Sequence, residues 1–118
     1  MLVQTREQAD ATIFQIKGRL DAATTPELEQ SILSWLEKGL KKLVMDFSEL
    51  EYINSAGLRI LVMSYQRLQP VGGQLIICGA RDYISEVFDI SGYSRIFPMF
   101  SSLDQAVSDS AETSVGGQ

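Results

Sequence analysis

Apolar and polar residues alternate from Thr12 to Lys17, which is the pattern of a strand with one face buried. Two later segments, 42–47 and 74–78, are short and mostly apolar runs, typical of strands buried on both faces. Residues 2–5 form a weaker strand candidate, and residues 8–11 would form the turn that joins it to strand 12–17. The pattern therefore predicts an N-terminal hairpin followed by two buried strands.

Apolar residues recur at helical spacing in the segments that follow the second and third of these strands. The first helix is expected to begin with Thr25 as N-cap and Pro26 as its first helical residue, and to end at Gly39. The second is expected to begin at Ser55 and to end before Gly72. The core-facing positions would be Leu28, Ile32, Trp35 and Leu36 in the first helix and Leu58, Leu61, Val62, Tyr65 and Leu68 in the second.

A third, shorter helix follows strand 74–78. We expect Asp82 to cap it, Tyr83, Val87 and Ile90 to form its apolar face, and Gly92 to end it.

The C-terminal part of the chain is less regular. Residues 96–100 are apolar and extended, but Pro98 restricts them to an edge strand or to no strand at all. Ser102 can cap a last helix that reaches Val107. Residues 109–118 are small and polar with no apolar face, so we expect a disordered tail.

Strands that alternate with helices after an opening hairpin predict a single α/β domain over residues 1–108. The sheet should be mixed but mainly parallel, with four to five strands, the hairpin at one edge and about four helices packed against it. Functional loops in such sheets lie at the carboxyl ends of the strands. The loops that contain Asp21 and Asn54-Ser55 are both of this kind.

Composition excludes several function classes. The 118 residues carry a net charge of −5 and no histidine, which argues against a nucleic-acid-binding surface and against catalysis by a histidine base. A single cysteine, Cys78, leaves no zinc cluster and no internal disulfide, and it fits a reducing cytoplasm. We find neither a secretion signal nor an apolar run long enough to cross a bilayer. No phosphate-binding glycine loop is present, so we expect no cofactor, no metal and no enzymatic activity.

Ser55 is the most informative position because it lies where a helix is expected to begin. Unpaired backbone N–H groups and the helix dipole favour negative charge there. Ser55 can therefore be a simple N-cap, or it can accept a phosphate that changes a binding surface. Asp21 has the same two readings, as a residue that caps its own loop or as a contact for a partner. Asp46 and Ser48 are expected to organise the turn after strand 42–47.

Three motifs together resemble the STAS domain of bacterial anti-sigma factor antagonists, and the resemblance extends over residues 2–108. They are Gly18-Arg19-Leu20-Asp21, Asp46-Phe47-Ser48 and Ile53-Asn54-Ser55-Ala56-Gly57-Leu58. The resemblance implies a protein that binds an anti-sigma factor, often a serine kinase, and so releases a sigma factor. It also implies that this kinase phosphorylates Ser55 and thereby breaks the complex, and that a serine phosphatase restores binding.

The resemblance implies a set of site residues as well. Ser55 would be the phosphoacceptor, and the partner-binding residues would be Asp21, Thr24, Asn54, Ser55, Ala56, Gly57, Leu58 and Arg59. Many members carry Asp at the position of Asn54 and Ser or Thr at that of Ala56. Because this chain has alanine at position 56, Ser55 is the only hydroxyl in this loop. We expect a monomer or a weak dimer. The alternative is an unswitched STAS scaffold or accessory subunit of a larger signalling or transport complex.

Overall fold

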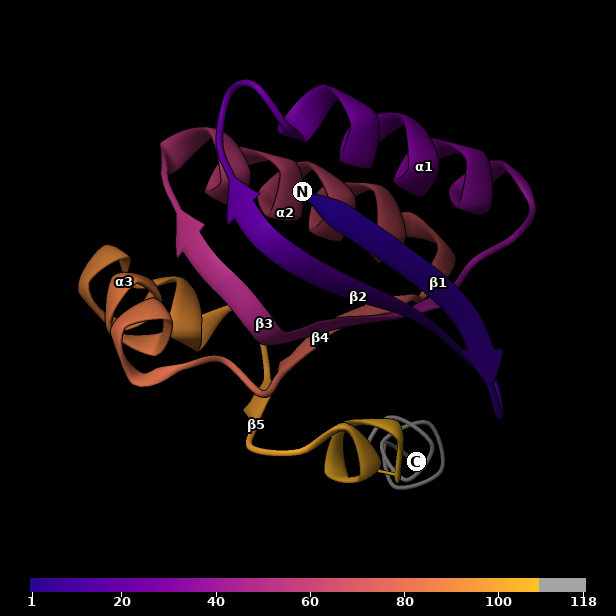
Figure 1. The fold of residues 1–118 in the computed structure, drawn as a ribbon. Helices are drawn as coiled ribbons and strands as arrows, with labels where there is room; N and C mark the ends of the chain where they lie inside the picture. Colours follow the sequence, from indigo (N-terminus) through magenta and orange to yellow (C-terminus); the bar gives the residue numbers. More distant parts are fainter. Residues whose placement is uncertain (109–118) are drawn as a thin grey trace.

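The computed structural model of the chain describes residues 1–108 (Figure 1). The strands are β1 (Leu2–Gln8), β2 (Ala11–Leu20), β3 (Lys42–Ile53), β4 (Gln74–Cys78) and β5 (Met99–Phe100). The helices are α1 (Thr25–Glu37), α2 (Ser55–Leu68), α3 (Asp82–Ser91) and a last helix over 103–108, with short 3-10 turns η1 (Gln69–Val71) and η2 (Tyr93–Arg95). The predicted tail, residues 109–118, lies outside the described residues.

The five strands form one sheet in the order β1-β2-β3-β4-β5. β1 pairs antiparallel with β2, and every other neighbouring pair is parallel. The prediction of a mixed, mainly parallel sheet with an N-terminal hairpin is therefore confirmed. β5 is a two-residue edge strand directly after Pro98, a position where the missing N–H of proline is tolerated, and the Pro98 carbonyl accepts from the Ile77 N–H at 2.9 Å.

Side chains on the two faces of the sheet form two separate cores. Phe14 and Ile16 of β2 belong to the larger core, which also takes in the apolar faces of α1, α2 and α3. Ala11 and Ile13 of the same strand point to the other face, where Ala106 of the last helix packs. Figure 1 shows the two layers, with α1 and α2 over one face and the last helix beneath the other.

Both strands that lead to the expected functional loops are longer than the sequence pattern indicated. β2 extends past Gly18 to Leu20, and β3 extends past Phe47 to Ile53. The added residues pair with each other, since Leu20 lies opposite Ile53. Ser48 and Glu49 are both exposed although they are consecutive, and they lie where the β2–β3 register shifts, since Gln15 pairs with Asp46 but Lys17 pairs with Glu49. Ser48 therefore lies within β3 rather than in a turn after it, and its N–H donates to Asp46 Oδ1 at 3.0 Å.

Helix starts differ from the predictions in two places. Thr24, not Thr25, is the N-cap residue of α1, and Thr25 is a buried first helical residue. Arg81 occupies the N-cap position of α3, so Asp82 is a first-turn residue rather than the cap. Each shift is a single residue, and acidic residues in a first turn still favour the helix through its dipole.

Of the three residues predicted for the apolar face of α3, Val87 packs against the larger core, but the prediction was wrong for Tyr83 and Ile90. Ile84 and Phe88 are fully buried, whereas Tyr83 is 48% exposed and Ile90 is 83% exposed. Phe88 turns inward because it joins an aromatic cluster, with its ring centroid 6.3 Å from that of Phe47 and 6.2 Å from that of Phe97.

Candidate functional site

The loops after β2 and β3 meet because their strands are neighbours and end together. The last paired residues of the two strands are Leu20 and Ile53, and the Asn54 N–H donates to the Leu20 carbonyl at 3.3 Å. Asp21 and Ser55 therefore lie at the same edge of the sheet, as expected for loops at the carboxyl ends of adjacent parallel strands.

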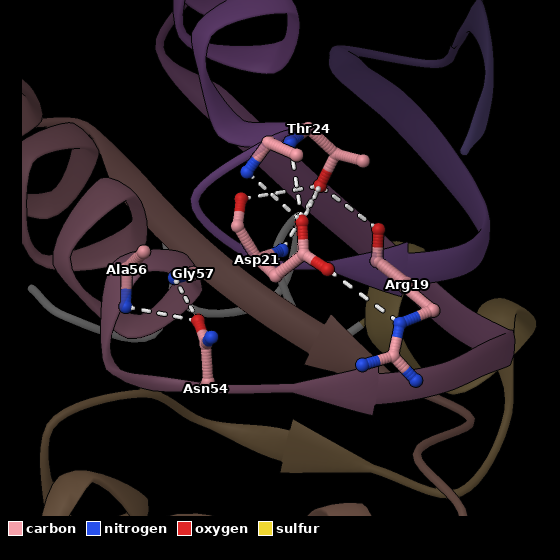
Figure 2. A network of polar contacts seen from close by, with 7 residues as sticks. Arg19, Asp21, Thr24, Asn54, Ala56 and Gly57 are labelled. Carbon is pink, nitrogen blue, oxygen red and sulfur yellow. Dashed lines mark hydrogen bonds and ion pairs between the residues drawn. The ribbon is translucent and has the colours of Figure 1, made fainter.

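Asn54 caps α2 with its side chain. Asn54 Oδ1 accepts from the backbone N–H of Ala56 at 3.1 Å and from that of Gly57 at 3.4 Å (Figure 2). The Asn54 carbonyl also accepts the first helical hydrogen bond, from the Leu58 N–H at 3.0 Å. Asparagine is among the best N-cap residues, so this start of α2 is locally favourable.

Ser55 is consequently not the cap, and its reading as a simple N-cap is wrong. It is the first helical residue of α2 and is exposed. Within residues 1–108, its hydroxyl makes no hydrogen bond. Ser55 therefore offers an unpaired, solvent-facing hydroxyl at the positive end of the helix dipole.

The Asp21 carboxylate and the Thr24 hydroxyl hold the neighbouring loop in shape. Asp21 Oδ1 accepts from the backbone N–H of Ala23 at 3.0 Å and from that of Thr24 at 3.3 Å. The Thr24 hydroxyl accepts from the Asp21 N–H at 2.9 Å and donates to the Arg19 carbonyl, also at 2.9 Å. These bonds confirm that Asp21 caps its own loop, and they fix the position of its carboxylate (Figure 2).

The second carboxylate oxygen of Asp21 faces a cation. Asp21 Oδ2 lies 3.5 Å from Arg19 Nε, and the Arg19 guanidinium also stacks over the Tyr52 ring, 4.1 Å from its centroid. Burial by itself would raise the pKa of Asp21. The hydrogen bonds from Ala23, Thr24 and Arg19 outweigh it and hold that pKa below its ordinary value of 3.8. Asp21 is therefore a fixed negative charge at neutral pH.

Arg19 and Tyr52 are members of this surface that sequence reasoning did not include among the site residues. They come from different strands, and the structure places them opposite each other in the β2–β3 register. Their proximity follows from the extension of both strands, which no local pattern indicated. The only signal in the sequence is that Arg19 belongs to the same short motif as Asp21.

The eight predicted partner-binding residues divide by exposure. Ser55 and Arg59 are exposed, while Gly57 and Leu58 are buried. The half-buried members are Asp21, Thr24, Asn54 and Ala56. Arg59 lies one helical turn after Ser55, on the same side of α2.

Close packing of α2 on the sheet requires a glycine at position 57. A Cβ at this position would lie 2.7 Å from Ile53 Cγ1 and 2.9 Å from the Leu20 carbonyl oxygen. Leu58 is 9% exposed and belongs to the larger core. Gly57 and Leu58 therefore set how closely α2 approaches the sheet, and so where Ser55 lies.

The described residues contain no group of three or more His, Cys, Asp or Glu side chains that could hold a metal ion. Over the same residues, no helix combines the length and the apolar character needed to cross a membrane. The candidate site is thus a polar surface with a fixed carboxylate, an unpaired hydroxyl and two arginines.

Comparison with known proteins places this chain in a family. The STAS domain model matches residues 3–106. The Bordetella bronchiseptica protein BtrV, which carries the name of an anti-sigma factor antagonist, is 34% identical over 103 residues, covering 86% of this chain and 89% of its own. An anti-sigma-B factor antagonist of Staphylococcus aureus is 28% identical over 90 residues, which is 76% of this chain and 83% of the relative.

The solved structures agree with the sequence comparison. The crystal structure of an anti-sigma factor antagonist from Mycobacterium paratuberculosis superimposes with a TM-score of 0.85 at 26% identity, over 93% of both chains. The chain belongs to the STAS domain family, among the anti-sigma factor antagonists.

Proposed function

We propose that this protein binds an anti-sigma factor through the surface around Asp21 and the start of α2, and that phosphorylation of Ser55 abolishes this binding. The partner would be an anti-sigma factor of the serine kinase type, and a serine phosphatase would restore the binding form. The protein would act as a cytoplasmic monomer or weak dimer, with no catalytic step of its own and no contact to nucleic acid.

One observation supports the switch above all others: Asn54, and not Ser55, caps α2. Modification of a capping hydroxyl would remove the bonds that begin the helix. Modification of Ser55 leaves both Asn54 bonds in place. The fold can therefore accept the phosphate while the surface changes.

The added charge fits the helix and alters the surface. Phosphoserine carries roughly −1.5 to −2 charges at pH 7, and negative charge near a helix N-terminus is stabilising. Arg59, one turn along α2, has no ion-pair partner among residues 1–108 and lies at the spacing that favours an acid four residues before it. Together with the ionised Asp21, the phosphate would give this edge of the sheet two fixed negative groups. A partner surface shaped for the unmodified loop would be repelled or sterically blocked.

The modification is tested by mass spectrometry. The protein and its Ser55→Ala variant would be incubated with ATP and an extract of the source cells, and the peptides mapped. We expect one added phosphate on Ser55 that is absent from the variant. A protein that stays unmodified in an extract with active kinases would contradict the switch while leaving the binding role open.

Binding is tested with paired variants. Ser55→Asp is expected to fold normally but to lose the anti-sigma factor, whereas Ser55→Ala should keep it. Ser102→Asp is the matched control, because Ser102 caps the last helix on the opposite face of the sheet. If Ser55→Asp and Ser55→Ala both bind like the wild type, the protein is the unswitched scaffold or accessory subunit instead.

A further inference from the structure

Helix α3 carries two apolar faces, and only one of them is used by the core. Ile84 and Phe88 lie four residues apart and are fully buried. Tyr83 and Ile90, seven residues apart, share a different face, where they are 48% and 83% exposed. Val87 is half-buried between the two faces. The second apolar face is thus unpartnered within residues 1–108.

An acidic row runs beside this exposed apolar face. Asp82, Glu86 and Asp89 follow each other at spacings of four and three residues, and all three are exposed. α3 contains no Lys or Arg to neutralise them. Arg81 lies just before the helix, where its Nε donates to the Ser48 carbonyl at 3.3 Å and so points toward β3. Arg95 lies beyond the other end, in η2.

The acidic row decides what can cover the apolar face. A second copy of the chain packed face to face on α3 would bring two acidic rows together, which is unfavourable. An anionic lipid surface and a nucleic acid are disfavoured for the same reason. The chain's own residues 109–118 contain Asp109 and Glu112 and no basic residue, so they are a poor match as well.

We propose that this surface, formed by Tyr83, Glu86, Val87, Asp89 and Ile90, docks a basic amphipathic helix of a partner protein. Such a helix would place apolar side chains on Tyr83 and Ile90 and Lys or Arg side chains on the acidic row. Figure 1 shows α3 at the edge of the domain, away from α1. The surface contains none of the residues of the Ser55 site, so the proposal does not rest on phosphorylation.

The test is site-specific photocrosslinking of the full-length chain in its source cells. Benzoylphenylalanine replaces Tyr83, which keeps an aromatic side chain at this half-exposed position. The crosslinked segment of the partner is then sequenced by mass spectrometry. We expect a segment with apolar residues at helical spacing and an excess of Lys and Arg. Crosslinks to a second copy of this chain, to an acidic or neutral segment, or to no protein at all would overturn the proposal.

Two variants make the test specific to the surface. The charge reversal Glu86→Lys with Asp89→Lys, and separately Ile90→Ser, should each lower the crosslinking yield at least tenfold. Both changes are at exposed positions, so the melting temperature should stay that of the wild type. An unchanged yield in the charge-reversed protein would show that the acidic row does not select the partner.

Discussion

Replacement of Asn54 by alanine tests the structural basis of the proposed switch. The change removes the acceptor that Asn54 Oδ1 provides for the N–H groups of Ala56 and Gly57, at 3.1 and 3.4 Å. Loss of an N-cap side chain typically costs about 1 kcal/mol of folding free energy. With a urea m-value of about 1.5 kcal/mol/M, the midpoint of unfolding should fall by about 0.7 M.

The matched variant is Ser55→Ala. Because the Ser55 hydroxyl makes no hydrogen bond within residues 1–108, its removal takes away no interaction that holds α2. Alanine also has the higher helix propensity, which can add up to about 0.5 kcal/mol. We therefore expect a midpoint equal to or slightly above that of the wild type, with the m-value unchanged.

A third variant, Asn54→Asp, separates the cap from the charge. The aspartate keeps the acceptor oxygen and adds a negative charge at the helix N-terminus, which stabilises by roughly 0.3–1 kcal/mol at low ionic strength. Urea unfolding of the variants, followed by circular dichroism, gives the comparison. If Ser55→Ala lost as much stability as Asn54→Ala, then Ser55 would share in the cap, and the argument that phosphorylation spares the fold would fail.

Three further predictions follow from contacts near the site and from the single cysteine. Gly57→Ala should destabilise by about 1–3 kcal/mol in urea unfolding, because its Cβ would overlap Ile53 and the backbone of β2; wild-type stability would contradict this packing. The pKa of Asp21, measured by NMR titration, should lie below 3.8 and should rise in Thr24→Val. The contribution of the ionised Asp21 to the free energy of unfolding should be fully present above pH 3.8 and should be lost as the pH falls through the lowered pKa. Burial, with the Asp46 charge as the smaller cause, raises the pKa of the Cys78 thiol to about 12. A thiol reagent at pH 8 should therefore label Cys78 only when the protein is unfolded in urea, and rapid labelling of the native protein would refute the burial of this thiol.

The fold was largely predictable because its signals are local and repeated. Alternation in strand 12–17 and the apolar runs at 42–47 and 74–78 reflect burial on one or both faces of a sheet, and the structure has strands at each of these places. Few sheet topologies are compatible with this order of alternating strands and helices. The lengths of β2 and β3 were not predictable, because Arg19 and Tyr52 extend strands through mutual pairing.

The candidate site was predictable in place but not in detail. Consecutive strand ends at Leu20 and Ile53 bring Asp21 and Ser55 to one edge of the sheet, and the order of elements implies this. The division of roles between Asn54 and Ser55 was not implied. Both residue types are good N-caps, and their positions differ by one, which is within the uncertainty of any sequence-based helix start.

By itself, the sequence determined the α/β architecture, the single domain and the edge at which the polar loops meet, because hydrophobic periodicity and turn residues encode these features locally. The tertiary structure alone decided which polar residue caps α2 and which face of α3 is buried. The apolar residues of α3 span an arc of roughly 160° at 100° per residue, wider than the core covers, so its pattern allows two orientations. Packing of Phe88 against Phe47 and Phe97 selects one of them and leaves Ile90 in solvent.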